Sequence, residues 1–277
     1  MSAATLPRRY YRVLGASGLS NLADGIRMAA FPLLAATLTD SATLLALVFA
    51  AGEAPWVVFG LWAGKVADQV DRRQLLHRVT LARAVLLVAL AALIVAGAAP
   101  LWLVAVAAFV LGVAEVLADS VTGTLVPSLV PEQQLERANS RMVAVQITGN
   151  ELVGPALGGL LFAVGAALPF VTNGTLLALA LLLLAGLPVL QGPIDDDEDD
   201  AGPSAPLRLL DGVPFIRARP VLRSITWSSA ILAAVDAAWF ALLVLFVREQ
   251  LVRSGPLPGR HHVDVPHREP PAGHDEG

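Results

Sequence analysis

The sequence predicts an all-α membrane protein with seven membrane-spanning helices. Hydrophobic residues make up 56% of the 277 residues and charged residues only 15%, whereas soluble domains carry about 25% charged residues. The mean hydropathy is +0.66, and the apolar residues form blocks long enough to cross a bilayer, which takes roughly 20 residues per helix. Strand-like alternation of apolar and polar residues is absent from the sequence, so helices are the expected elements.

Six apolar segments are expected to form one helical bundle over residues 10–190. Two charge-free runs are each too long for one helix, and each contains a break with glycine and proline that is typical of a helical hairpin. Polar turns separate the remaining segments. In chain order the evidence is the segments 13–38 and 43–63, the run 84–114 with its break at 97–100, the prolines Pro127 and Pro131 with the polar connection 132–137, and the run 152–194 with its break at 165–169.

The residues outside this bundle differ sharply in composition. Six consecutive acidic residues, 195–200, repel one another and indicate a disordered linker; calcium binding is the alternative, although the ligand alternation of a calcium loop is missing. The tail carries four of the five histidines, so metal binding is an alternative there too, but we expect no metal site and no cofactor. The expected organisation is a cytoplasmic tail (1–9), the bundle (10–190), an acidic linker with an amphipathic helix at 207–219 (191–223), a seventh span (224–248) and a polar, disordered tail (249–277).

The distribution of arginine and lysine predicts the orientation of the chain. Basic residues occur before the first segment and in every second connection, whereas the turns near Asp40, Ala98 and Ala166 have none. Because basic loops stay in the cytoplasm, the N-terminus is expected to be cytoplasmic. Lys65 is the only lysine, a bias typical of GC-rich genomes, which favours a bacterial inner membrane. The basic residues before the first segment and in these connections are Arg8, Arg9 and Arg12, then Lys65, Arg72, Arg73 and Arg78, then Arg137 and Arg141, and finally Arg208, Arg217, Arg219 and Arg223.

A charge-dense turn between the second and third segments contains a recognisable motif. Its residues Gly64, Asp68, Arg72 and Arg73 match the G-x-x-x-D-(R/K)-x-G-(R/K)-(R/K) loop of the major facilitator superfamily in spacing and position. Gln69 and Asp71 depart from that pattern, although Asp tolerates the left-handed turn conformation that glycine favours. The chain therefore resembles this family, and the resemblance implies a loop that latches the cytoplasmic side.

The fifth segment resembles the G-x-x-x-G-P-x-x-G-G element of the antiporter branch of this family. It contains Gly149, Gly154, Pro155, Gly158 and Gly159, with Asn150 where the first glycine is usual. Plain packing of small residues would explain the glycines but not the proline. The segments 126–131 and 137–140 are similar to the enterobactin-exporter and macrolide-efflux group. One departure is Ala108, which stands four residues before Gly112 where drug antiporters usually carry an arginine for proton coupling.

The resemblance implies export of a small molecule, such as a drug or siderophore, driven by protons across the lipid bilayer. Family members have two six-helix halves with the substrate between them, whereas this chain has one half and a seventh helix. We therefore expect a truncated chain that transports only by self-association that completes the cavity. The alternative is a non-transporting membrane remnant or assembly partner of a full-length exporter.

Ionisable residues inside the segments are the candidate substrate and proton pathway, because an unpaired charge there costs several kcal/mol. Asp24 and Arg27 are spaced to pair on one helix face, and Glu115 and Asp119 share a face of the fourth segment. Acidic residues outnumber basic ones at depth, so some carboxyls are expected to be protonated or to face a hydrated cavity. The complete set is Asp24, Arg27, Glu53, Glu115, Asp119, Glu151 and Asp236.

Other function classes have little support in the sequence. A nucleophile–base pair, a metal constellation and a phosphate-binding glycine loop are all missing, so we do not expect an enzyme. Nucleic-acid binding is not expected either, since the arginines follow the membrane topology and form no additional basic surface. The Asn173-Gly174-Thr175 sequence fits the glycosylation pattern, but it lies inside the sixth segment, where no glycan could be attached.

Overall fold

The computed structural model describes residues 6–185 together with 217–229, 231, 232 and 235. The chain divides into two compact units, 1–204 and 205–277. In the second unit residues 220–229 are helical, which covers the beginning of the predicted seventh span. The acidic linker, most of the predicted amphipathic helix, the rest of the seventh span with Asp236, and the tail lie outside the described residues.

Helices account for nearly all of the described residues in the first unit. The described residues of this unit form no strand. The predicted fifth span is built from three consecutive pieces, α5, η3 and α6, of which η3 is a π-helix. The elements are α1 (Arg8–Leu38), α2 (Ala42–Gln69), α3 (Arg72–Val95), α4 (Leu101–Leu125), η1 (Val126–Ser128), η2 (Glu132–Gln134), α5 (Leu135–Gln146), η3 (Ile147–Val153), α6 (Gly154–Val164) and α7 (Leu168–Ala185).

Five stretches in these helices are long and apolar enough to cross a membrane: Thr43–Gly60, Arg72–Val95, Leu101–Ser128, Glu132–Val164 and Leu168–Ala185. Helix α1 has 31 residues and extends over about 46 Å, more than the roughly 30 Å of a bilayer's hydrocarbon core. Polar residues such as Asn21, Asp24 and Arg27 lower its mean hydropathy, so α1 is not among the five. Its membrane span remains a prediction from the sequence.

The charged turn between the second and third spans is shorter than expected. Residues 64–69 continue α2, and only Val70 and Asp71 separate it from α3, so most of the predicted charge-dense turn is helical. The Asp71 carboxylate caps α3 by accepting hydrogen bonds from the backbone N–H groups of Arg73 (2.9 Å) and Gln74 (3.1 Å). Asp71 has a φ of −58°, so it does not adopt the left-handed conformation that it could tolerate at this position.

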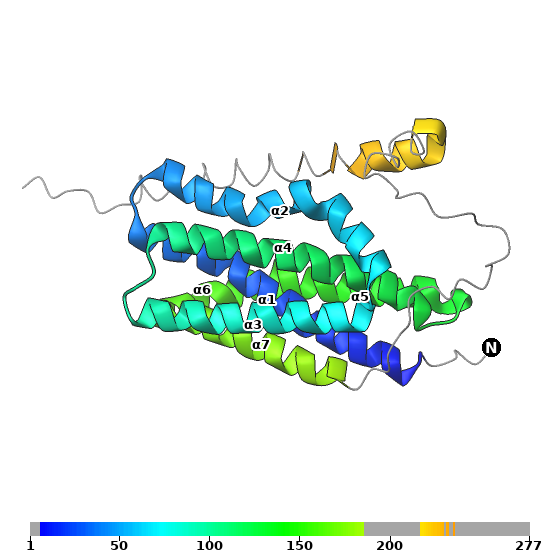
Figure 1. Cartoon of the computed structure of the whole chain (residues 1–277), viewed down its shortest axis with the longest axis horizontal. Coiled ribbons are helices and arrows are strands. Elements are labelled where there is room, and N and C mark those ends of the chain that lie inside the picture. The colour runs from blue at the N-terminus through cyan, green and yellow to red at the C-terminus, as the bar shows by residue number, and fades with distance from the viewer. Residues whose placement is uncertain (1–5, 186–216, 230, 233–234, 236–277) are drawn as a thin grey trace, which may run out of the picture. The chain divides into compact units, whose positions relative to one another are not determined.

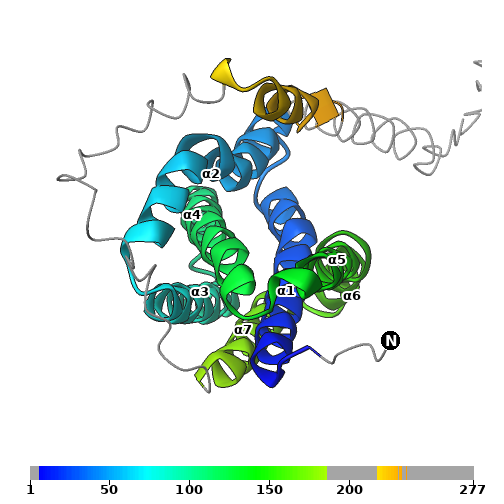
Figure 2. The ribbon, with the colours of Figure 1, turned by 90° about the vertical axis from the view of Figure 1, so that its right-hand side faces the viewer.

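The helices form a bundle in which α2 packs against α4 and α1 packs against α7 and the α5–η3–α6 rod (Figure 1, and end-on in Figure 2). Two apolar clusters fill its interior. One lies where α1 and α3 begin and α4 and α7 end, with Tyr10, Leu125 and Leu184. The other, with Phe31, Leu87, Leu111 and Phe170, lies towards the opposite ends of the same helices. Buried polar side chains occur between these clusters.

Close helix contacts depend on glycines at three positions in the fifth span. A Cβ on Gly158 would lie 2.5 Å from the Ile26 carbonyl oxygen of α1, and Cβ atoms on Gly149 and Gly154 would also meet the α1 backbone. A Cβ on Gly112 of α4 would lie 2.5 Å from the Gly52 carbonyl oxygen of α2. By contrast, Gly60 and Gly64 have open space beside them in the described part of the structure.

Candidate functional site

The polar layer between the two apolar clusters is formed by charged residues near the middle of three helices. Asp24 and Arg27 lie half-way along α1, Arg83 half-way along α3, and Glu115 somewhat past the middle of α4. Asp24, Arg83 and Glu115 are buried. We call these four residues the charge cluster.

Asp24 and Arg83 form the most deeply buried ion pair of the cluster. The Arg83 guanidinium donates through Nη2 to Oδ1 of Asp24, and its side chain is only 1% exposed. It also donates through Nη1 to the Ser20 hydroxyl oxygen at 3.1 Å. Ser20 and Asp24 are one helical turn apart on α1, so a single guanidinium joins two positions of α1 to α3.

Arg27 and Glu115 form the second ion pair and join α1 to α4. The Arg27 guanidinium donates through Nη2 to Oε2 of Glu115. Its Nε lies 3.6 Å from Oδ1 of Asp24, which confirms the predicted pairing of Asp24 with Arg27. Asp24 therefore lies between two arginines, and the four residues carry two positive and two negative charges.

Forming a buried ion pair stabilises the protein little, whereas breaking one by removing a partner destabilises it strongly. Taking charges out of water costs several kcal/mol per ion, and their mutual attraction offsets this cost only while every partner is present. The stability of this arrangement is therefore sensitive to a change in any one of the four charges. Protonation of a carboxyl, or approach of another cation, would change the partners available to Arg27 and Arg83.

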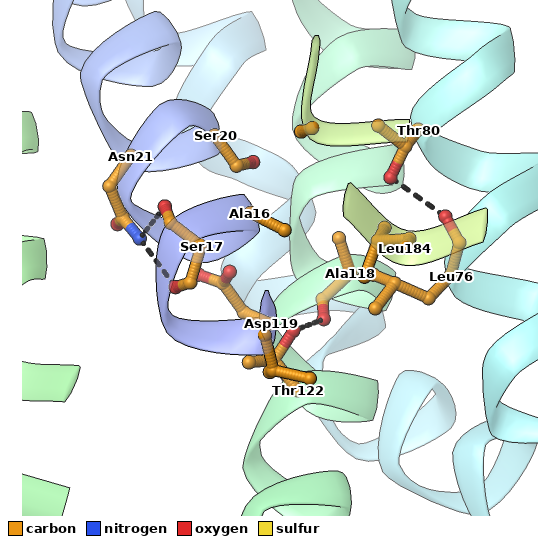
Figure 3. Close-up of a pocket in the computed structure, with 12 residues that line it drawn as sticks. Ala16, Ser17, Ser20, Asn21, Leu76, Thr80, Ala118, Asp119, Thr122 and Leu184 are labelled. Atoms are coloured by element: carbon orange, nitrogen blue, oxygen red, sulfur yellow. Dashed lines mark hydrogen bonds between the residues drawn. The ribbon is translucent and has the colours of Figure 1, made fainter. Parts of the chain in front are cut away.

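Asp119 lies one helical turn beyond Glu115 and lines a small cavity of about 20 Å³ (Figure 3). Polar residues of α1, α3 and α4 surround this cavity, and α7 contributes Ala180 and Leu184. Its volume is enough for one water molecule, which needs about 10–15 Å³ and two to four polar partners. The polar residues that line it are Ser17, Ser20, Asn21, Thr80, Asp119 and Thr122.

The remaining predicted pathway residues do not join the cluster. Glu53 on α2 and Glu151 in η3 are both exposed, and among the described residues neither forms a salt bridge. Asp236 lies outside the described residues. Position within an apolar segment therefore identifies both residues on the surface of this unit and residues in its interior.

The arginines of the loop motif contact the ends of two other helices. Arg73 donates from Nη2 to the Ala185 carbonyl oxygen at the end of α7 (2.9 Å), and Arg72 donates from Nη1 to the Thr124 carbonyl oxygen near the end of α4 (3.5 Å). A cation at a helix C-terminus is favoured by the helix dipole. Gly64 lies in open space, and the Asp68 side chain is outside the described part of the structure.

Some glycines of the fifth-span motif contact α1, and one does not. Gly149, Gly154 and Gly158 lie against α1, whereas a Cβ on Gly159 would have no neighbouring atom within 4 Å. Pro155 is the second residue of α6, which begins directly after η3. Its missing N–H coincides with the end of the π-helix, where the hydrogen-bond ladder changes register.

Two residues of the site, Arg83 and Ser20, are not among those predicted from the sequence. Arg83 directly precedes the charge-free run 84–114, and an arginine at the edge of such a run is itself a signal of function. Ser20 carries no comparable signal, since serines are common in membrane helices. Asn173, in contrast, is buried in α7 and donates to the Ala23 carbonyl oxygen of α1, in agreement with its predicted position inside a span.

In a comparison with known families, residues 13–254 match the family described as Major Facilitator Superfamily. A comparison with curated individual proteins finds no match. The family match covers the charge cluster, both motifs and the helical part of the second unit. It does not favour the alternative of a remnant that does not transport.

Proposed function

Because the chain belongs to the major facilitator superfamily, it is a multi-pass membrane protein of the transporter class, not an enzyme, and we propose that it exports a small molecule in exchange for protons. The observation that supports exchange is the charge cluster at mid-length of α1, α3 and α4. Ionisable residues are expensive inside a membrane and are typical of ion and proton pathways.

The cluster is suited to link proton binding to helix movement. Its two ion pairs connect α1 to α3 and α1 to α4, so a proton gained in or beside the cluster changes the electrostatic attraction that holds α1 to its neighbours. The arginines must keep an acceptor as that attraction changes, because a buried unpaired charge is strongly unfavourable. Protonation therefore favours a different arrangement of α1 relative to its neighbours, as an alternating-access cycle requires.

The absence of the usual arginine before Gly112 is compatible with this proposal. Ala108 occupies that position and packs against Gly52 of α2, while guanidinium groups reach the α4 carboxyl and the α1 carboxyl from Arg27 and Arg83. The positive charge thus comes from α1 and α3 instead of α4. Asp119 adds a carboxyl beside the balanced charge cluster, and this excess of negative charge favours a cationic substrate, such as a cationic drug.

Proteoliposomes that contain the full chain test the proposal. With ethidium as the cationic probe and an acidic lumen, exchange predicts uptake of ethidium together with a rise of the luminal pH, measured with a trapped pH-sensitive dye. Asp24→Asn should abolish both signals. The matched control is Glu53→Gln, because Glu53 is exposed and outside the cluster. Uptake that needs no pH gradient, or that survives Asp24→Asn, would contradict the proposal.

The substrate class is tested in cells. Growth inhibition of an efflux-deficient bacterium, with and without the gene, is measured over a panel of drugs and siderophores. Export predicts protection against some members of the panel, and the protection should disappear with Asp24→Asn. If the variant protects as well as the unchanged protein, export does not depend on the charge cluster.

A further inference from the structure

The charge cluster and Asp119 together contain one carboxyl more than they contain arginines. Asp24 and Glu115 each pair with an arginine. Within the described part of the chain, Asp119 has neither a hydrogen bond nor a salt bridge, although it interacts electrostatically with Asp24, Arg83 and Arg27. If all five groups are ionised, one negative charge is left without a counter-charge in a largely apolar bundle.

The cavity beside Asp119 offers both hydrogen-bond acceptors and a donor. The hydroxyl groups of Thr80 and Thr122 donate to the carbonyl oxygens of Leu76 (2.7 Å) and Ala118 (2.8 Å), so their oxygens are left to accept. The Ser20 oxygen accepts from Arg83, which leaves its O–H to donate. Acceptors and a carboxylate beside a hydroxyl donor suit a water molecule, which both donates and accepts.

We propose that Asp119 carries the exchangeable proton of this transporter, and that the proton reaches it through a single water molecule held in the cavity between α1, α3 and α4. This inference rests on the proposed proton coupling and assigns the proton to a carboxyl outside the two ion pairs. Binding one proton converts the Asp119 carboxylate to the neutral acid, and the five groups then have no net charge. Release of that proton restores the excess negative charge next to Arg83.

The geometry favours Asp119 over the paired carboxyls as the site of exchange. Asp24 is 3% exposed, whereas Asp119 is partly exposed and borders the cavity. The cavity lies towards the end of the bundle where α1 and α3 begin and α4 and α7 end, which the arginine distribution predicts to be cytoplasmic. The charged groups around Asp119 are Asp24 and Arg27 on α1, Arg83 on α3 and Glu115 on α4; α7 contributes only apolar residues to the cavity.

Infrared spectroscopy of the purified full chain in lipid nanodiscs tests the assignment without any transport. The carbonyl stretch of a protonated carboxyl is followed during a pH titration. One such band should disappear as the pH rises in the unchanged protein, be absent at every pH in Asp119→Asn, and be present at a shifted frequency in Asp119→Glu. Asp40→Asn, an exposed turn residue, is the matched control and should leave the band unchanged.

Two results would overturn the inference. A titrating band that persists in Asp119→Asn but disappears in Asp24→Asn or Glu115→Gln would place the proton on a paired carboxyl. A titration curve that shifts when sodium chloride replaces choline chloride would show that the cavity binds a metal cation instead. If Asp119→Asn does not fold, as judged by circular dichroism, an unshifted band in Asp119→Glu still contradicts the assignment.

The infrared test and the transport test can fail separately. A titrating Asp119 without ethidium-driven proton movement would leave the proton site in place and reject proton-coupled export. Proton-coupled export with no titrating band from Asp119 would support the function and reject this residue as the carrier.

Discussion

Among single residues, Arg83 is the buried residue that links two helices in the polar layer through two side-chain hydrogen bonds. It connects Ser20 and Asp24 of α1 to α3 while almost completely shielded from water. Arginine suits this position because its guanidinium group is planar, stays charged and presents several donors at once. Replacing it removes two connections and leaves the Asp24 carboxylate facing only the more distant Nε of Arg27.

Arg83→Gln is expected to destabilise the protein by about 3–5 kcal/mol, since it leaves a buried carboxylate without its main partner. The measurement is thermal unfolding in detergent micelles. Asp24→Asn in the same chain should recover part of the loss, because the double variant no longer buries an unpaired charge, and the double-mutant cycle gives the coupling. Arg78→Gln, at an exposed position of α3, is the control, and an equal loss there would contradict the prediction.

The predictable part of the site follows the strength of the signal at each residue. Asp24, Arg27, Glu115 and Asp119 were predicted because charges within apolar segments are conspicuous, and the Asp24–Arg27 pair followed from a spacing of three. Glu53 and Glu151 give the same signal, yet their side chains are exposed. Whether such a side chain is buried or exposed depends on the rotation of its helix about the helix axis. That rotation is set by contacts between helices. The pairing of Asp24 with Arg83, 59 residues apart, depends on the same contacts.

Among the elements, the contact between α1 and the fifth span depends most strongly on small residues. Gly149, Gly154 and Gly158 bring the α5–η3–α6 rod against the α1 backbone, next to the charge cluster. In a lipid environment such contacts are stabilised by van der Waals packing, which weakens rapidly with distance. The glycine motif therefore also determines how closely the fifth span approaches Asp24.

Gly158→Ala is expected to lower stability by about 1–3 kcal/mol, because the new Cβ would overlap the Ile26 carbonyl oxygen and force the two helices apart. Gly159→Ala is the matched control in the next position, where the Cβ meets open space. It should be neutral or stabilising by up to about 1 kcal/mol, as expected for alanine in place of glycine in a helix. Thermal unfolding of the two variants compares them, and equal melting temperatures would contradict the predicted contact.

Asp71→Ala is expected to destabilise the start of α3 by about 1 kcal/mol, because two backbone N–H groups lose their acceptor. Asp71→Asn retains a side-chain oxygen and should lose much less. Hydrogen exchange at the first turn of α3 is the appropriate measurement. If the alanine variant exchanges no faster there than the asparagine variant, the carboxylate does not cap the helix.

Element types could be predicted better than element ends. The breaks at 97–100 and 165–169 were predicted from glycine and proline, and both separate helices in the structure. The charges in the segment 64–69 predict a turn, whereas the structure has a helix there. A helix continues through charges as readily as through leucine, and its end is fixed instead by the cap at Asp71. Composition indicates where a span leaves the lipid and does not indicate where its helix stops.

For the whole molecule, the main expectation is a cytoplasmic N-terminus with alternating connections. The apolar cluster that contains Tyr10, Leu125 and Leu184 places the beginnings of α1 and α3 at the same end as the ends of α4 and α7. Such an up-and-down arrangement puts the turns after α1 and α3 on one side and the turns after α2 and α4 on the other. The distribution of basic residues then predicts which side is cytoplasmic.

Single-cysteine labelling can test this orientation directly, because the chain has no cysteine. In intact cells, a membrane-impermeant maleimide should label Asp40→Cys and Ala98→Cys. Val70→Cys and Glu132→Cys should be labelled only after the membrane is permeabilised. All four positions are exposed, so differences in labelling report the side of the membrane. Labelling of the second pair in intact cells would reverse the predicted orientation.

The π-helix η3 has a consequence for how the fifth span can change. A π-helical turn accommodates one more residue than an α-helical turn, and an α-helix rotates by about 100° per residue. Converting Ile147–Val153 to α-helical hydrogen bonding with every residue kept would therefore rotate Gly154 and Gly158 away from α1 by about 100° relative to α5. The hydrogen-bond pattern of η3 thus sets the phase of α6. Deletion of one residue in η3 should be tolerated better than insertion of one, because the deletion leaves a regular helix with α6 in the same phase.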